Sequence, residues 1–473
     1  MAFKRYKCVA DNSITNAYYP NMLYRATGSN CGGADSLQVF HIFGQQSTSS
    51  HEVSRILLKF PIESISNDVS LGKVPSSGSC KYFLKLYNAV HPFTLPRNFT
   101  LNIQPVSSSW DEGEGMDMDD FIDYGYCNWN NRQSSSYGVF DWSTPGGDFL
   151  TSNTASVFFE KGNEDIEVDI TDLVEKWKSQ TIDNNGITIK LTDHLETAFS
   201  SSYIKKFYSR SSEYFFLQPT LEARWDDCIK DKRSSFFASS SLATEQDNKN
   251  TLVFYNRIRG KLVDIPGYSS GSNIFLKIYT DRAAGVCLTN TPISASWVKT
   301  GIYTASFVLD TSASYVYDRW YNSNLLTCFY TGSEIQVLTQ ENYEYNNNSD
   351  YKISMPGLKD EYDKKETVLF RIFTQKDDRN YNLYNVMTEE QDIDVVEDMF
   401  YSVRRVIDNF EVIPYGTGSL EYTKCSYDKS GSYFYLDMSN FESDYMYEFS
   451  FLAKQEQNNY KEFTDRFKFR VRK

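Results

Sequence analysis

Short stretches of alternating apolar and polar residues recur along the whole chain, separated by Gly, Pro, Ser and Asn. A period of two places every second side chain on the same face of an extended strand, so these stretches predict strands with one buried face. The clearest examples lie at 80–87, 98–104, 187–191 and 273–279. We therefore expect an all-β protein in which sheets pack face to face.

One segment has helical spacing instead. Within 169–177, Leu173, Val174 and Trp177 fall on one face of a helix, and Thr171 is placed to cap its first turn. The segment is too short to be more than a lid on the edge of a sandwich.

Breaks between the strand-rich regions predict three β modules in series. A last strand at 219–225 and a polar linker at 226–233 close the first module. A second break is predicted at 341–350. We assign 1–226 to the first module, 227–345 to the second and 346–473 to the third. The second and third are predicted to be smaller, immunoglobulin-like (Ig-like) β-sandwiches.

The charge balance argues against nucleic acid as a partner. The chain has 62 Asp and Glu against 48 Lys and Arg, a net charge of −14, whereas nucleic-acid affinity depends largely on cationic side chains. No window has the roughly 20 uninterrupted apolar residues of a membrane helix, and the first residues lack an apolar stretch of signal-peptide length. We expect no membrane association and no export signal.

Cysteine and histidine offer little for metal or covalent chemistry. Eight cysteines are scattered without a Cys-x-x-Cys pair, which predicts reduced, mostly buried thiols. Only four histidines occur, none in a His-x-x-x-His arrangement, and there is no Gly-x-x-x-x-Gly-Lys phosphate loop. We expect no enzymatic activity and no cofactor, with structural Ca²⁺ as the one ion to consider.

That ion is suggested by the segment 110–123, which has seven carboxylates in 14 positions and no Lys or Arg. Ca²⁺ takes six to eight oxygen ligands, so such crowding can supply a site. The candidate ligands are Asp111, Glu112, Glu114, Asp117, Asp119 and Asp120. Their spacing is not that of a helix-loop-helix calcium loop, and a solvated acidic loop is the alternative.

Aromatic residues follow in a region rich in Ser, Asn and Gly, where a long loop is expected. They are Tyr124, Tyr126, Trp129, Tyr137 and Trp142. Three roles remain open for them: a protein interface, in which Tyr and Trp are enriched, packing within the module, or stacking on the apolar faces of sugar rings.

The order of motifs in the first 226 residues resembles a DNRLRE-type domain. The matching segments are Ala-Asp-Asn-Ser-Ile-Thr-Asn at 10–16, 28–39, Ser-Arg-Ile-Leu-Leu-Lys-Phe at 54–60, Ser-Trp-Asp-Glu-Gly at 109–113, Gly-Gly-Asp-Phe at 146–149, 168–177, 185–187, Phe-Tyr-Ser-Arg at 207–210 and Pro-Thr-Leu-Glu-Ala-Arg-Trp at 219–225. That family resembles jelly-roll carbohydrate-binding modules and is found in secreted, surface and phage virion proteins. The resemblance implies an N-terminal jelly-roll β-sandwich without a defined set of catalytic residues.

The C-terminal segments 402–409, 412–416 and 426–438 look like the last module of virion structural proteins of marine tailed phages. Together the two resemblances imply a non-enzymatic structural component of a virion, in the head, neck or tail. It would be assembled in the host cytoplasm and bind other virion proteins in a multi-copy assembly. The alternative is a carbohydrate-binding module for a host-surface polysaccharide, and a glycan-cleaving enzyme ranks third.

Overall fold

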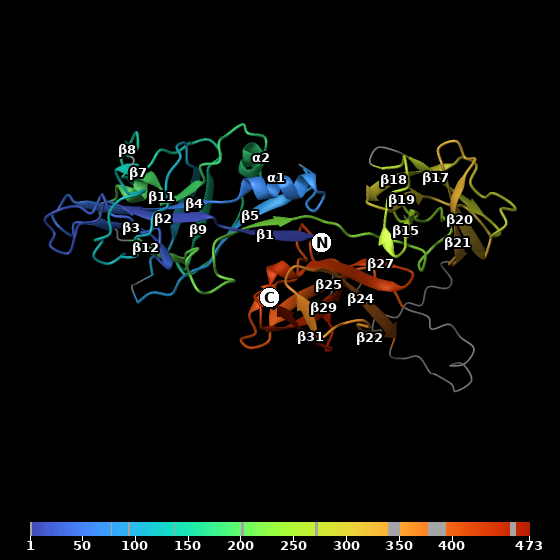
Figure 1. The fold of residues 1–473 in the computed structure, drawn as a ribbon. Helices are drawn as coiled ribbons and strands as arrows, with labels where there is room; N and C mark the ends of the chain where they lie inside the picture. The colour runs from blue at the N-terminus through green and yellow to red at the C-terminus, as the bar shows by residue number, and fades with distance from the viewer. Residues whose placement is uncertain are drawn as a thin grey trace. The chain divides into compact units, whose positions relative to one another are not determined.

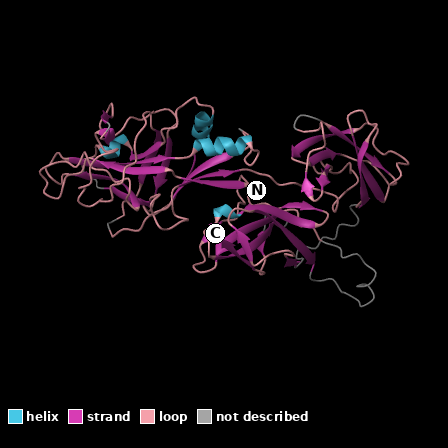
Figure 2. Ribbon diagram, viewed as in Figure 1, coloured by secondary structure: helices cyan, strands magenta, loops and turns pink. Residues whose placement is uncertain are grey.

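The structure, a computed structural model, describes residues 2–76, 78–92, 95–136, 138–199, 203–269, 273–338, 351–376, 394–454 and 460–473. It is all-β: strands dominate, and the helices are few and short (Figure 2). The chain divides into two compact units, Met1–Asp226 and Asp227–Lys473, and each is described by itself (Figure 1). Within the described ranges, no helix is long and apolar enough to cross a membrane.

The first unit is a β-sandwich of two antiparallel sheets. The four-stranded sheet contains, in spatial order, β1 (Phe3–Lys7), β13 (Thr220–Arg224), β5 (Lys81–Leu86) and β10 (Ile166–Asp169). The seven-stranded sheet contains β12 (Tyr203–Tyr208), β3 (Ser36–Phe43), β4 (His51–Lys59), β11 (Ile187–Leu191), β6 (Phe99–Pro105) and β9 (Ala155–Phe159), with β2 (Ala10–Thr15) paired to β4.

Alternation in the sequence explains how these sheets pack. Leu84 on β5 lies opposite Leu221 on β13, and both point into the core between the sheets. From the facing sheet, Ile103 and Ile189 lie side by side in the same core. Alternation predicted strands at 80–87, 98–104, 187–191 and 273–279. In the structure these are β5, β6, β11 and, in the second unit, β17 (Ile274–Tyr279).

Two helices close one end of this core. In α2 (Thr171–Lys178), Leu173, Val174 and Trp177 are buried, as the helical spacing predicts. The predicted cap is wrong, because the helix begins at Thr171 itself and the Asp169 side chain accepts the Thr171 N–H at 2.9 Å. The second helix, α1 (Ile62–Ser70), packs against α2 and was not predicted. A third, α3 (Asp193–Glu196), is a single turn.

Strand β4 of the seven-stranded sheet is buried on both faces. Residues 106–136 and 138–150 form a layer over the outer face of this sheet, where Val53 and Leu57 from β4 pack against Trp129 and Trp142. This layer includes the small hairpin of β7 (Asn131–Ser135) and β8 (Gly138–Asp141). The layer therefore acts as part of the interior of the first unit, although most of it is loop.

In the second unit, one module is a six-stranded antiparallel sheet that curls around its own core. Its strands, in spatial order, are β14 (Asn250–Tyr255), β19 (Ile302–Phe307), β18 (Ile293–Lys299), β17, β20 (Tyr315–Tyr321) and β21 (Cys328–Gln336). Phe254 on β14 stacks on Tyr330 from the opposite end strand, with ring centroids 5.2 Å apart. A short hairpin of β15 (Arg257–Ile258) and β16 (Lys261–Leu262) follows β14.

The C-terminal module packs two further sheets around a cluster of phenylalanine rings that includes Phe370, Phe434 and Phe449. One sheet contains β22 (Tyr351–Ser354), β24 (Thr367–Lys376), β28 (Gly431–Asp437) and β27 (Ser426–Asp428). The other contains β23 (Glu361–Asp363), β31 (Phe467–Arg472), β29 (Met446–Lys454), β25 (Met399–Arg405) and β26 (Glu411–Ile413), with β30 (Tyr460–Glu462) paired to β29. A 3₁₀ turn spans Met438–Asn440.

The two modules of the second unit are not simply consecutive. Residues 229–231 add to the edge of β27, since the Tyr427 N–H donates to the Ile229 carbonyl at 3.0 Å and the Asp231 N–H to the Tyr427 carbonyl at 3.2 Å. The six-stranded module is thus inserted between this segment and the rest of the C-terminal module. The boundary predicted between 345 and 346 lies outside the described residues.

Candidate interaction surface

Two buried asparagines hold the acidic segment 110–123 and the residues that follow it onto the first unit. Asn12 donates to the Cys127 carbonyl at 2.9 Å, and Asn30 donates to the Glu112 carbonyl at 2.7 Å. Asn30 Oδ1 accepts the Gly115 N–H at 2.9 Å. A Cβ on Gly115 would lie 2.0 Å from the Asn30 carbonyl oxygen, so only glycine permits this approach. The segment is therefore fixed in position by hydrogen bonds.

Asp11, Glu112 and Arg210 form a charged network beside it. The Arg210 guanidinium donates to both oxygens of Glu112 at 3.0 and 2.8 Å, and the Arg210 N–H donates to Asp11 at 2.5 Å. Asp11 is almost fully buried. Burial raises its pKa to about 7, although the hydrogen bond from Arg210 opposes this, and the nearby charge of Glu112 adds to the rise.

A second charged cluster lies on the four-stranded sheet. Glu222 receives Arg5 Nε at 2.7 Å on one oxygen and Arg224 Nε at 2.6 Å on the other. Arg224 also forms an ion pair with Glu167 at 2.7 Å, and Lys85 forms a second ion pair with Glu167 at 3.3 Å. Burial alone would raise the pKa of Glu222, but the charges of Arg5, Lys85 and Arg224 outweigh it and lower the pKa to about 2.

Three of the predicted calcium ligands already have protein partners. Asp111 accepts from Gln133 at 2.9 Å, and Glu112 is held by Arg210. Asp117 accepts the backbone N–H groups of Asp119, Asp120 and Ile122 at 2.9 to 3.1 Å. Burial alone would raise the pKa of Asp117, but these N–H groups lower it overall.

The other three, Glu114, Asp119 and Asp120, have exposed side chains. The six carboxylates are not gathered at one point, and among the described residues no group of three or more His, Cys, Asp or Glu side chains is arranged to hold a metal ion. Their roles here are to brace the loop and to give its surface a negative charge. Calcium binding stays a prediction.

The four aromatic candidates that the structure describes separate into two kinds. Trp129 and Trp142 are interior, with 8% and 4% of their surface exposed, and Arg55 lies 5.0 Å from the Trp129 ring. Tyr124 and Tyr126 are 67% and 39% exposed. Tyr137 lies outside the described residues. Of the three roles left open, packing within the module is the one that Trp129 and Trp142 fill, because they cover the seven-stranded sheet, whereas an interface or sugar stacking stays open for the two described tyrosines.

Tyr124 belongs to a larger exposed apolar group, which we call the loop surface: Leu23, Tyr24, Met116, Ile122 and Tyr124, each 63% to 73% exposed. Two loops carry these residues, and the Tyr19 hydroxyl joins them by donating to the Tyr124 hydroxyl at 2.9 Å.

The backbone of both loops is tied down beneath the loop surface. The Tyr19 N–H donates to the Tyr24 carbonyl at 3.0 Å, and the Met116 N–H donates to the Asp123 carboxylate at 2.8 Å. Composition did not reveal this surface, because its members come from separate segments.

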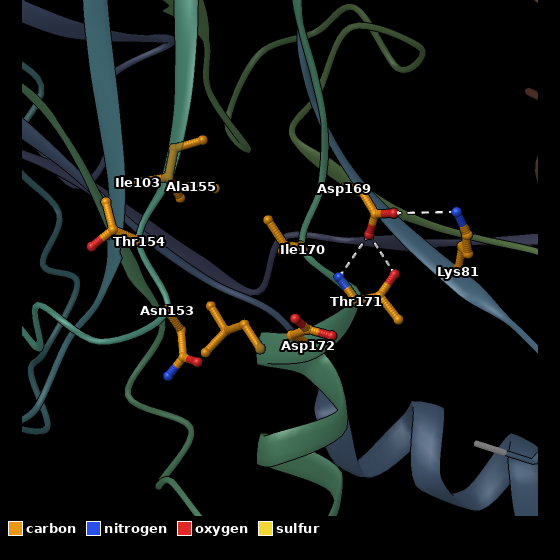
Figure 3. Close-up of a pocket in the computed structure, with 10 residues that line it drawn as sticks. Lys81, Ile103, Asn153, Thr154, Ala155, Asp169, Ile170, Thr171 and Asp172 are labelled. Carbon is orange, nitrogen blue, oxygen red and sulfur yellow. Dashed lines mark hydrogen bonds and ion pairs between the residues drawn. The ribbon is translucent and has the colours of Figure 1, made fainter. Parts of the chain in front are cut away.

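A pocket of about 400 Å³ opens at another edge of the first unit, where β9 begins and β10 leads into α2 (Figure 3). Its walls are apolar at Ile103, Ile170 and Leu173. Its polar lining residues are Lys81, Asn153, Thr154, Asp169, Thr171 and Asp172. Hydroxyl, amide and carboxylate groups of this kind can form hydrogen bonds with a small polar ligand.

Five of the eight cysteines are buried, as predicted: Cys8, Cys31, Cys80, Cys127 and Cys425. Cys287 and Cys328 are exposed, and Cys228 is intermediate.

Comparison with known proteins identifies no family. No family model matches the chain, and no curated protein matches it. Among solved structures, it is similar to trypsin-activated alpha-2-macroglobulin from Escherichia coli, with 10% identity over 89% of this chain and 24% of that one and a TM-score of 0.14.

Two structures of Salmonella alpha-2-macroglobulin are also similar. A mutant has 9% identity over 98% of this chain and 28% of that one, with a TM-score of 0.14. The methylamine-reacted form has 10% identity over 100% and 26%, with a TM-score of 0.15. The chain spans about a quarter of the length of these proteins, and TM-scores this low do not establish a common fold.

Proposed function

We propose that the chain is a non-enzymatic structural component of a tailed-phage virion, placed in the head, neck or tail and acting through protein–protein interfaces. The observation that supports this most directly is the loop surface. It gathers five large apolar side chains in exposed positions on loops held by backbone hydrogen bonds. Exposed apolar groups of this kind mark interaction sites, and an ordered surface loses little conformational entropy on binding.

The charges around the loop surface indicate the kind of partner. Glu114, Asp119 and Asp120 are exposed beside Met116 and Ile122, in a segment without Lys or Arg. A partner surface with cationic side chains around an apolar centre would match this pattern, because opposite charges favour association and discourage wrong partners. Within a virion, such a partner would be another structural protein.

We also propose the finer architecture that the resemblance implies. The first unit would be a DNRLRE-type jelly roll, and 227–345 and 346–473 would be smaller Ig-like β-sandwiches. The meeting of Asp11, Glu112 and Arg210 in one network supports the first assignment, because three separate motif segments then serve one structural purpose.

Mass spectrometry of purified phage particles tests the function. We expect the chain in particles at a fixed copy number, and we expect Met116→Ala with Tyr124→Ala to reduce incorporation about tenfold by removing two anchors of the loop surface. The matched control is Ile407→Ala, which truncates another exposed apolar residue in the second unit. Particles that lack the wild-type chain would overturn the proposal.

The pocket favours a second candidate, a carbohydrate-binding module for a host-surface polysaccharide. Glycan arrays with the full chain test it: binding that disappears in Asn153→Ala with Asp172→Ala, and persists in Asp119→Ala, would support sugar recognition at the pocket. Glycan binding that survives the combined Asn153→Ala and Asp172→Ala substitutions would exclude the pocket as the sugar-binding site. Substitutions of Trp129 or Trp142 are unsuitable probes, because loss of an interior ring would disturb the fold.

A further inference from the structure

Strand β9 is an unprotected sheet edge. It ends the seven-stranded sheet and, among the described residues, pairs only with β6. Its sequence, Ala-Ser-Val-Phe-Phe, contains neither a charged residue nor proline. Natural proteins usually protect an exposed edge with charge, proline or a covering segment, because its unpaired backbone groups attract another strand. The absence of such protection at β9 suggests that the edge is used.

Among the described residues, the other end strands of the two large sheets, in their spatial order, carry such charges. β1 contains Lys4, Arg5 and Lys7, β10 contains Glu167 and Asp169, and β12 contains Lys205 and Lys206. β12 is partly covered as well, since the Ala89 N–H donates to the Lys206 carbonyl. The uncharged sequence of β9 is therefore an exception within its own unit.

The core is also incompletely closed at this edge. Ala155 and Val157 point toward the core but are only partly buried, and so is Val168 on the neighbouring β10. On the opposite face of β9, Phe158 is 61% exposed. A strand added beside β9 would cover apolar surface on both faces of the sheet.

We propose that β9 pairs antiparallel with β9 of a second copy of this chain, about a two-fold axis at Val157. This register places Ser156 of one copy opposite Phe158 of the other and Ala155 opposite Phe159, so no like charges meet. The pairing is isologous and closes after two copies, joining two seven-stranded sheets into one. The interface is small, which predicts a concentration-dependent dimer.

Symmetric pairing is disfavoured at β1 and β12. In β1 the same geometry centred on Arg5 would set Arg5 against Arg5, and in β12 it would set Lys205 against Lys206. Like charges directly opposite each other destabilise a strand pair. The self-complementary sequence of β9 is what favours a second copy as its occupant.

Sedimentation of the full chain over a range of concentrations, with hydrogen exchange of β9 amides, tests the proposal. We expect reversible dimerisation that protects residues 155–159. Ser156→Lys with Phe158→Lys should weaken the dimer at least about tenfold, because the introduced charges face each other. Ser156→Glu with Phe158→Glu should weaken it equally, and mixing the two variants should restore a heterodimer. Val139→Lys, at another exposed apolar position, is the matched control.

The mixing experiment also controls for misfolding, since two misfolded variants would not restore a dimer. A wild-type chain that stays monomeric, a dimer that leaves β9 amides unprotected, or variants that do not restore pairing on mixing would each overturn the inference. The test is independent of the proposed function. A chain that is monomeric but present in particles would support the proposed function and refute the dimer. A chain that dimerises through β9 but is absent from particles would support the dimer and refute the proposed function.

Discussion

Asp11 and Glu222 are both buried carboxylates of the first unit, yet their surroundings shift their pKa values in opposite directions. Burial raises the pKa of each. Around Glu222 the charges of Arg5, Lys85 and Arg224 overcome that effect and bring the pKa to about 2. Asp11 accepts only the backbone N–H of Arg210, whose guanidinium is bound by Glu112, and the pKa of Asp11 rises to about 7. The number of cations within reach, rather than burial, decides whether a buried carboxylate stays ionised.

The two sites therefore contribute to stability in opposite pH ranges. A lowered folded-state pKa stabilises the fold above the unfolded value and is lost on acidification, whereas a raised one makes ionisation in the folded state costly. The Glu222 cluster strengthens the four-stranded sheet at neutral pH, and the Asp11 network weakens its surroundings there. Four substitutions test this contrast.

Arg224→Met should have the largest effect. It removes a buried cation from Glu222 and Glu167, and breaking a buried ion pair from one side costs about 3 to 5 kcal/mol. Hydrogen exchange of the β13 amides in the full chain at pH 7 measures the loss. Adding Glu222→Gln should recover part of it, and a double variant no more stable than Arg224→Met would contradict the pairing.

Glu222→Gln alone should lower the free energy of unfolding by roughly 3 kcal/mol at pH 7, the linkage expected for a pKa lowered from 4.5 to about 2. The wild-type advantage should disappear as the pH falls from about 4.5 to 2, since both states are then protonated. Acid titration of stability for both chains gives the comparison. Equal acid sensitivity in the two chains would contradict the lowered pKa.

Asp11→Asn should stabilise the chain at pH 8 by up to about 4 kcal/mol, the linkage for a pKa raised from 3.8 to about 7, because the ionised carboxylate is disfavoured where it is buried. Its folded pKa is above the ordinary 3.8, so folding takes up a proton between about pH 4 and 7, and wild-type stability falls as the pH rises through that window. The asparagine variant should lack this slope in urea denaturation. An unchanged slope would show that Asp11 is not its source.

Asp117→Ala should have the smallest effect, about 1 kcal/mol, because this carboxylate stabilises exposed loop N–H groups. This substitution tests whether backbone N–H groups can stabilise an ionised carboxylate in the way that cations stabilise Glu222. Thermal unfolding measures the change, with Asp119→Ala as the matched control. Repeating the melts with CaCl₂ and with a chelator tests the calcium prediction: a melting temperature that responds only in the wild type would support an ion at Asp117.

Local pattern predicted local structure well. The strand at 187–191 has the predicted bounds, and the buried face of α2 follows its helical spacing. Both depend on side-chain periodicity within a single segment. Packing within the module was one of three roles left open for Trp129 and Trp142, and the local pattern could not select it because their neighbours are polar loop residues. Apolar residues at 56–58, on both faces of β4, were the available sign that the sheet is covered on both sides.

Long-range pairing was beyond such patterns. Nothing in residues 229–231 indicates that they pair with β27. Nothing local links Asn30 to the acidic segment or Asn12 to Cys127. Partner choice depends on the whole chain, whereas periodicity reports only which face of an element is buried. The polar residues that position the candidate surface were for this reason harder to predict than the strands.

The inserted module imposes an order on how the second unit can form during synthesis. Ile229 and Ser426, which are hydrogen-bonded in the finished protein, are separated by 197 residues. At ribosomal rates the earlier segment waits on the order of tens of seconds for its partner. All strands of the inserted six-stranded module have been synthesised by then, so this module can fold first. The C-terminal module around it is completed last. A ribosome that stops early therefore leaves the C-terminal module without its last strands.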